Sequence, residues 1–140
     1  MIQSQDTKRG GEVESWLASV DVITLFVEDV QRAKAFYHDV FDLSTVYEDE
    51  HSAVVNFDNL TVNLLVSSQA PDLIAPAKVA SAGDGSRFQF TIRVDDVDET
   101  CAELATRGVT LLNGPMDRPW GIRTASFTDP DGHIWEIANG

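Results

Sequence analysis

The sequence predicts an α+β fold built from two successive βαβββ modules. Two observations lead to this prediction. First, the strand-like run I-T-L-F-V-E-D-V, which starts at Ile23, recurs with similar residues as F-T-I-R-V-D-D-V, which starts at Phe90. Second, each run is followed by a helical spacing of apolar residues and then by three further strand-like runs. Neither half can bury one face of a sheet alone, so we expect the two modules to pack together.

Length and charge exclude several classes of protein. The chain has 140 residues, of which 43% are hydrophobic, and this is enough for one structural domain with a core. A net charge of −13 argues against nucleic acid and against anionic membrane surfaces as partners. The only cysteine, Cys101, allows no internal disulfide, and the N-terminal residues lack the apolar core of a signal peptide. We therefore expect a cytoplasmic protein, with Cys101 as a buried structural thiol.

Changes in composition along the chain predict four segments. Residues 1–19 are polar and should form a mobile tail. Within this tail, Trp16 either packs against the body of the protein or stays exposed. Residues 20–66 form the first module and residues 87–140 form the second. Residues 67–86 are rich in Pro, Gly, Ala and Ser and should form a linker.

The first module should begin with a strand over residues 20–27, because β-branched and apolar residues dominate this run. Side chains alternate along a strand, so Val22, Thr24 and Phe26 share one face. Asp29 should cap the helix that follows. Three more strands are predicted, over residues 45–48, 52–57 and 60–66.

The second module should begin with a strand over residues 87–94, in which Gln89, Thr91 and Arg93 share one face. Asp96 should cap the helix that follows this strand. Three more strands complete the module, and they are predicted over residues 110–112, 122–127 and 133–138.

The last two strands enclose the sequence Asp129-Pro130-Asp131-Gly132, which is typical of a tight turn. Alternation along the last strand puts Trp135 and Ile137 on one face and Glu136 on the other. A lone carboxylate among apolar neighbours has two explanations, and the sequence leaves both open. Glu136 either faces solvent or points into a cavity.

Four segments of the chain resemble the vicinal oxygen chelate superfamily: V-E-D-V at 27–30, A-F-Y-H-D-V-F at 35–41, V-D-D-V at 94–97 and D-P-D-G-H-I-W-E at 129–136. This superfamily includes glyoxalase I, extradiol dioxygenases, and the fosfomycin and bleomycin resistance proteins. The resemblance extends from Val20 to Ala138, and it implies a half-open, curved sheet with the helices outside. It is specific for the fold but weak for function, because one fold hosts many chemistries.

Metal-using members of this superfamily hold the ion on four inward-facing residues, and the resemblance places these positions at Val22, Asn63, Gln89 and Glu136. Only Glu136 is a usual ligand, since Val22 has no donor atom and amides are weak partners for transition metals. We therefore expect no bound metal and no other cofactor. The histidines do not complete the set, and each is expected at the surface: His38, His51 and His133.

The segment Pro119-Trp120-Gly121-Ile122-Arg123 is similar to one in bleomycin resistance proteins, which trap a ligand between subunits and perform no chemistry on it. Trp120 offers a rigid ring for stacking on a planar ligand, or it covers a hydrophobic edge. Arg123 offers its guanidinium to a carboxylate of the ligand, or it neutralises Glu136. Both pairs of alternatives remain open at the level of the sequence.

The leading hypothesis is a protein that binds a small, partly apolar molecule without a metal ion, similar to the drug-sequestering members. An open sheet leaves apolar surface and strand edges uncovered, so we also expect a homodimer. The alternative is a metal-dependent lyase, isomerase or dioxygenase with a non-standard ligand set, in which Glu136 is a ligand or a base. A third hypothesis is a structural or regulatory subunit without a ligand. The expected ligand-binding cleft is lined by Phe26, Asn63, Gln89, Arg93, Trp120, Arg123 and Glu136.

Overall fold

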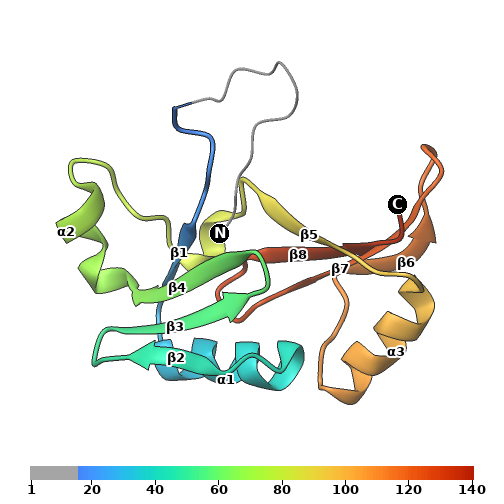
Figure 1. Ribbon diagram of the computed structural model, residues 1–140, viewed down its shortest axis with the longest axis horizontal. Helices are drawn as coiled ribbons and strands as arrows, with labels where there is room; N and C mark the ends of the chain where they lie inside the picture. The colour runs from blue at the N-terminus through green and yellow to red at the C-terminus, as the bar shows by residue number, and fades with distance from the viewer. Residues whose placement is uncertain (1–15) are drawn as a thin grey trace.

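The computed structural model describes residues 16–140, so most of the expected N-terminal tail lies outside the described residues. Figure 1 shows two four-stranded sheets, with the strand orders β1-β4-β3-β2 and β5-β8-β7-β6. In each sheet the first strand of the module runs parallel to the last, and the other neighbours are antiparallel. Each half of the chain forms one βαβββ unit, which confirms the predicted α+β fold of two modules.

The elements follow one another in the same order in both modules. The first module contains β1 (Val22–Val27), α1 (Val30–Phe41), β2 (Thr45–Glu48), β3 (Ser52–Phe57) and β4 (Leu60–Val66). The connector, residues 67–88, contains the short helices η1 (Ser67–Gln69), α2 (Ala70–Ile74) and η2 (Ala82–Asp84). The second module contains β5 (Gln89–Arg93), α3 (Val97–Thr106), β6 (Asn113–Asp117), β7 (Arg123–Thr128) and β8 (Ile134–Ala138).

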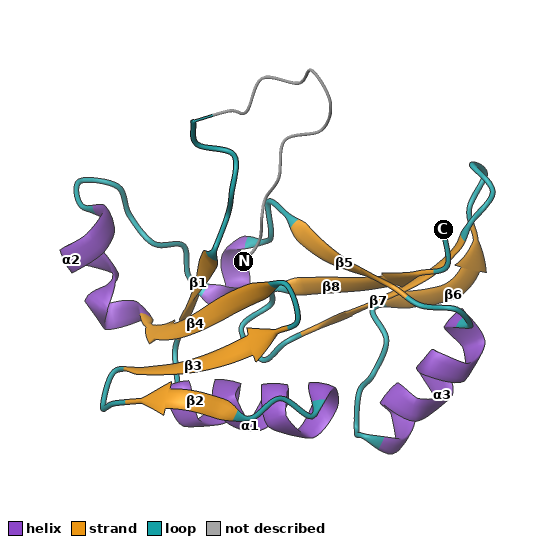
Figure 2. Cartoon of the chain, viewed as in Figure 1, coloured by secondary structure: helices purple, strands orange, loops and turns teal. Residues whose placement is uncertain are grey.

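Each sheet has one face covered by a helix and one face that is open. Helix α1 packs on β3 and β4, and α3 packs on β6 and β7, so both long helices lie outside the sheets (Figure 2). Both helices begin at the predicted caps, because the carboxylate of Asp29 accepts a hydrogen bond from the Arg32 amide and that of Asp96 accepts one from the Glu99 amide. The open face of the first sheet carries large apolar side chains, among them Val22, which is 53% exposed.

Replacing Asp96 with alanine should lower the free energy of unfolding by about 0.5–2 kcal/mol, the usual effect of losing an N-cap side chain. The reason is that the Glu99 amide, now 3.0 Å from a carboxylate oxygen, would lose its acceptor. Chemical denaturation of the Asp96→Ala variant measures this loss. Asp95→Ala is the matched control, since Asp95 is exposed and precedes the cap. Equal effects of the two substitutions would show that the cap contributes nothing specific.

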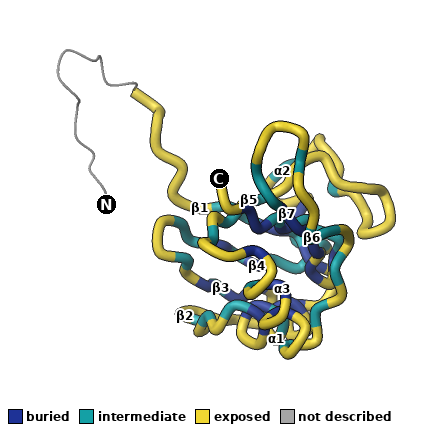
Figure 3. Tube along the Cα trace, turned by 90° about the vertical axis from the view of Figure 1, so that its right-hand side faces the viewer, coloured by how far each residue is buried: buried dark blue, intermediate teal, exposed yellow. Residues whose placement is uncertain are grey.

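A cluster of aromatic rings joins the two modules. Trp135 of β8 is only 4% exposed. The centre of its ring lies 4.7 Å from that of Phe90 on β5, 5.1 Å from that of Phe41 on α1 and 5.3 Å from that of Phe57 on β3. The apolar core is therefore continuous between the modules. Figure 3 shows the buried stretches of β3, β4 and β7 together in the interior of the molecule.

One strand differs from its predicted position. The strand expected over residues 110–112 is wrong, because the structure places β6 at Asn113–Asp117. The sequence did not predict a strand here because it contains Gly114 and Pro115, and both residues are rare in strand interiors. β6 tolerates them because it lies at the edge of its sheet and carries a bulge between Asn113 and Met116. Gly114 is required there, because a Cβ on this residue would lie 2.6 Å from a carbonyl oxygen of β7.

Candidate functional site

The open face of the second sheet carries a group of polar side chains around Glu136. The strand register pairs Glu136 with Thr91 on β5 and with Ser126 on β7, so these three residues share this face. The Thr91 hydroxyl donates a hydrogen bond of 2.9 Å to Oε1 of Glu136. Gln89 and Arg93 lie two residues before and two residues after Thr91, and they therefore flank Glu136 diagonally. The structure thus brings together three of the predicted site residues on one face.

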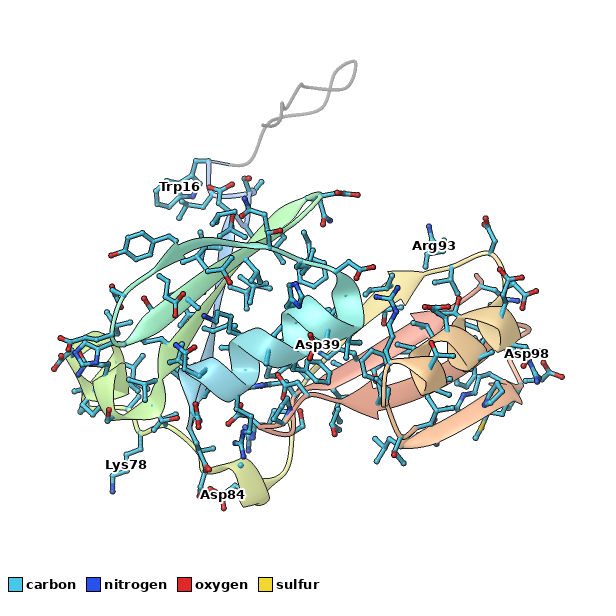
Figure 4. The ribbon with its side chains drawn as sticks, turned by 90° about the horizontal axis from the view of Figure 1, so that it is seen from below. Trp16, Asp39, Lys78, Asp84, Arg93 and Asp98 are labelled. Carbon is cyan, nitrogen blue, oxygen red and sulfur yellow. The ribbon has the colours of Figure 1, made fainter. Side chains whose placement is uncertain are left out.

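This face offers hydrogen-bonding groups of three kinds. Gln89 and Arg93 are exposed, whereas Glu136 is half-buried. Figure 4 shows Arg93 on β5 pointing away from the body of the fold. An amide donates and accepts, a guanidinium only donates, and an ionised carboxylate only accepts. The arrangement can therefore fix the orientation of a small polar or zwitterionic group on the sheet.

Arg123 lies on the opposite face of this sheet, towards helix α3. Its guanidinium donates to Oδ1 of Asp98 over 3.0 Å and to Oδ1 of Asp117 over 3.1 Å. The hydrogen bond with Asp98, followed by that with Asp117, raises the pKa of Arg123. The structure therefore does not place Arg123 beside Glu136, and the arginine stabilises the contact between α3 and the β6–β7 hairpin.

Arg118 occupies the face on which Arg123 was expected, and the sequence analysis missed it. The Nε of Arg118 donates a hydrogen bond of 2.8 Å to the hydroxyl of Thr124, which lies on the same face as Glu136. Its Nη2 donates to Oδ1 of Asn113 over 3.2 Å. The register of the β7–β8 hairpin could have shown that Arg123 does not share a face with Glu136. Once Ser126 is opposite Glu136, Arg123 must point to the other side of the strand.

Trp120 lies at the tip of the β6–β7 hairpin, and 68% of its surface is exposed. It stands between Pro119 and Gly121, and Gly121 adopts the positive φ of 98° that this turn requires. The hairpin tip lies beyond the row of residues that contains Arg93, so Trp120 is at one end of the open face. The indole is therefore mostly accessible to solvent at this end of the sheet.

Two other predicted site residues lie on the open face of the first sheet. Phe26 is on β1 and Asn63 is on β4. Asn63 pairs with Thr24 in the register, and its amide lies 3.5 Å from the Thr24 hydroxyl. Asn63 and Glu136 lie in different sheets, and no strand of one sheet pairs with a strand of the other.

The residues at the four superfamily metal positions do not fit a transition metal. Val22 has a hydrocarbon side chain, Asn63 and Gln89 are amides, and Glu136 is the single carboxylate. Within residues 16–140, no group of three His, Cys, Asp or Glu side chains is arranged to hold a metal ion. We therefore derive no reaction step through a metal.

A buried hydrogen-bond network surrounds Asp129, in the turn before β8. Oδ2 of Asp129 accepts hydrogen bonds from the Tyr37 hydroxyl, over 2.6 Å, and from Nδ1 of His133, over 2.7 Å. Oδ1 accepts from the backbone amides of Asp131 and His133. Burial, followed by the charge of Asp129, raises the pKa of Tyr37 far above its usual value, so the phenol stays neutral. The hydroxyl of Tyr37 in turn accepts from Nε1 of Trp135.

His133 is therefore not the surface histidine that the sequence analysis expected. Its side chain is only 16% exposed, compared with 70% for His38 and 47% for His51, which do lie at the surface. The prediction failed because it considered only whether His133 and Glu136 share a strand face. The spacing of four residues between Asp129 and His133 across a tight turn was the available signal.

Asp131 is a second buried carboxylate in the same turn. Its Oδ1 accepts a hydrogen bond of 2.9 Å from the Glu28 amide and lies 3.6 Å from the Arg32 guanidinium. Its Oδ2 is buried and has no hydrogen-bond partner within the described chain. Burial raises the pKa of Asp131, and it outweighs the opposing effect of the hydrogen bond from Glu28. The ionised form of this group is therefore disfavoured in the folded protein.

Because the ionised carboxylate is disfavoured, the difference in the free energy of unfolding between the wild type and Asp131→Asn should depend on pH. Because the folded-state pKa is raised, the contribution of Asp131 to the free energy of unfolding is fully present below its ordinary pKa and is lost as pH rises through the raised value. Acidification from neutral pH towards about 4 should therefore favour the wild type over Asp131→Asn. Urea denaturation of both proteins across this range measures the difference. A difference that stays constant with pH would contradict the assignment.

A cavity of about 330 Å³ lies where the connector crosses between β1 and the turn before β8. Its apolar lining includes Phe26, Val79 and Phe88, and its polar lining includes His133. Figure 4 shows the connector residues Lys78 and Asp84 along one edge of the molecule. Phe26 is the only residue of the predicted cleft that lines this cavity.

The fold is shared with proteins of a known superfamily. The model of the Glyoxalase/Bleomycin resistance protein/Dioxygenase superfamily matches residues 19–137, and the chain belongs to this superfamily. The chain is 32% identical to the uncharacterized protein YraH of Bacillus subtilis (strain 168) over 119 residues, which are 82% of this chain and 93% of YraH. It is 25% identical to the metallothiol transferase FosB of Lysinibacillus sphaericus (strain C3-41), covering 87% of this chain and 82% of FosB.

Among solved structures, the antibiotic binding protein TnmS3 from Streptomyces sp. CB03234 superimposes with a TM-score of 0.65. The identity is 26%, and the alignment covers 90% of this chain and 98% of TnmS3. Members of the superfamily bind small molecules of different kinds, so this similarity leaves the ligand open. Within residues 16–140, none of the helices is long and apolar enough to cross a membrane.

Proposed function

We propose that this protein binds a small, partly apolar molecule without a metal ion and performs no chemistry on it. The open face of the second sheet is the proposed site, with Gln89, Arg93 and Glu136 as polar anchors and Trp120 as a stacking surface. The observation that carries the proposal is the exposed indole of Trp120, which stands on a rigid turn at the end of this polar face. The similarity to an antibiotic binding protein agrees with this class of function.

The Trp120→Ala variant tests the stacking role. Stacking of a ring on an aromatic side chain contributes about 1–3 kcal/mol, so affinity for a planar ligand should fall by this amount. The free energy of unfolding should change by less than about 0.5 kcal/mol, because the indole is mostly exposed. The measurements are tryptophan fluorescence during titration with a panel of planar aromatic antibiotics, and chemical denaturation. A large loss of stability would show that Trp120 is a core residue and would contradict the proposal at this position.

The proposed site is completed by a second copy of the chain. Strands β1 and β5 each pair on one side only, so both present free backbone groups at a sheet edge. Exposed apolar side chains, among them Val22 on the open face of the first sheet, also favour association. We therefore propose a cytoplasmic homodimer in which Phe26 and Asn63 of one copy face Glu136 of the other. Light scattering at micromolar concentration tests this, and a monomer would contradict it.

The second candidate is a metal-dependent lyase, isomerase or dioxygenase with a non-standard ligand set. The observation that favours it is the placement of Gln89 and Glu136 as diagonal neighbours on one face. Metal analysis of protein purified without a chelator or nickel resin distinguishes the two candidates. The binding proposal expects no stoichiometric metal. Near-stoichiometric zinc, nickel, iron or manganese that disappears in Glu136→Ala would favour the enzyme.

A further inference from the structure

The orientation of His133 is fixed from the interior of the protein. The Asp129 carboxylate accepts from Nδ1 of His133, and Asp129 itself is held by the Tyr37 hydroxyl and two backbone amides. The side chain of Asp129 is fully buried. Because the carboxylate accepts, Nδ1 carries the hydrogen, and Nε2 is left for a second hydrogen bond. The orientation of the ring is therefore fixed by Asp129.

His133 lies at the cavity beneath the connector. Because Nδ1 is bonded to Asp129, Nε2 on the far side of Cε1 points away from this carboxylate. Within residues 16–140, Nε2 has no hydrogen-bond partner, yet it is not among the buried unpaired atoms, so it is accessible. His133 lines the cavity. The cavity is therefore lined by a histidine whose orientation is set before any ligand enters, and its Nε2 accepts a hydrogen bond when the imidazole is neutral.

The remaining lining determines what kind of molecule fits. Phe88 packs beside His133, with ring centres 6.2 Å apart, and Phe26 and Val79 add apolar surface. The lining also contains the charged residues Glu28, Arg87 and Asp131. A volume of about 330 Å³ is at the lower end of the range for pockets that hold small organic ligands. A one- or two-ring molecule matches this volume. Its ring would contact the phenylalanines, and a hydroxyl would satisfy the acceptor.

We propose that the cavity between the connector and the turn before β8 is a second small-molecule site, which binds a hydroxylated aromatic molecule through a hydrogen bond from its hydroxyl to Nε2 of His133. This site is separate from the open face of the second sheet, and it exists within a single chain. Neither Glu136 nor Trp120 lines it. Phe26 is the one residue that lines this cavity and also belongs to the proposed dimeric site, so the variants that test the cavity change other residues.

The test uses beta-naphthol and its methyl ether, which has a similar shape but cannot donate the hydrogen bond. Amide NMR titration of the full chain should show beta-naphthol shifting the signals of Phe88, Gly132 and His133. The methyl ether should bind about tenfold more weakly, the effect of one lost hydrogen bond. In His133→Phe the affinity for beta-naphthol should fall about tenfold, to that of the methyl ether, which should be unaffected by this substitution.

Three further variants keep the test decisive. His38→Phe makes the same substitution at an exposed histidine and should bind like the wild type. In Glu136→Gln the shifts of Phe88, Gly132 and His133 caused by beta-naphthol should be the same as in the wild type, because Glu136 does not line the cavity. Ala82→Phe places a large side chain at the connector wall of the cavity and should abolish binding of both probes, even if His133→Phe does not fold. Absence of binding to the wild type, equal binding of the two probes, or shifts confined to other residues would overturn the proposal.

Discussion

Replacing Trp135 with alanine is expected to lower the free energy of unfolding by about 3–5 kcal/mol, the typical effect of removing a large buried aromatic side chain. Trp135 is 4% exposed, and its ring contacts Phe41 and Phe57 of the first module and Phe90 of the second. Its removal would leave a cavity at the point where the two cores meet. Chemical denaturation followed by circular dichroism measures the loss.

The chain provides its own control for this prediction. Trp120→Ala deletes the same side chain at a position that is 68% exposed, and it should have little effect on stability. Trp135→Phe keeps a ring in the cluster but loses the hydrogen bond of 3.1 Å from Nε1 to the Tyr37 hydroxyl. Its effect should lie between those of the wild type and Trp135→Ala. Similar losses for Trp120→Ala and Trp135→Ala would refute the assignment of the cluster as the joint between modules.

The second large effect is expected from Asp129→Ala. This substitution removes the acceptor of the Tyr37 hydroxyl, of Nδ1 of His133 and of two backbone amides, all in the interior or close to it. Buried donors left without a partner are costly, and breaking such a network typically costs about 3–5 kcal/mol. The free energy of unfolding, measured by urea denaturation, should fall by this amount.

Two milder variants separate the roles of the groups around Asp129. Asp129→Asn keeps one acceptor oxygen and should recover part of the loss. Tyr37→Phe leaves the carboxylate bonded to His133 and the backbone, so its effect should be smaller than that of Asp129→Ala. If Tyr37→Phe alone reproduced the full loss, the phenol rather than the carboxylate would be the centre of the network.

Most of the fold could be predicted from the sequence, because its signals are local. Apolar alternation located β2, β3 and β4 at their observed residues, and Asp29 and Asp96 were identified as caps from their position before an apolar helical stripe. The exception is β6, which could not be predicted from local patterns. Its glycine and proline are allowed by the sheet edge and by a bulge, and both depend on contacts with β7.

The candidate site was less predictable, because it depends on register and on distant partners. Alternation within β5 and β8 correctly placed Gln89, Arg93 and Glu136 on one face. The face of Arg123 required the register of the β7–β8 hairpin, and the role of His133 required Tyr37, which is 92 residues from Asp129 in the chain. No pattern within one strand reports such a contact. Residues whose position depends on the register of a hairpin or on a partner far away in the chain were therefore the ones that sequence reasoning missed.

The hydrogen bond between Trp135 and Tyr37 has a consequence for how the chain folds. It joins residues that are 98 positions apart, so it closes most of the polypeptide into a loop. Contacts of such high sequence separation have a large entropic cost and form slowly, after local structure is in place. The ring of Trp135 also packs against Phe41 and Phe57 of the first half, and Phe127 adds a second contact to Phe41. We therefore expect the repeated halves to behave as one cooperative folding unit, in which neither half becomes native before the other has been synthesised.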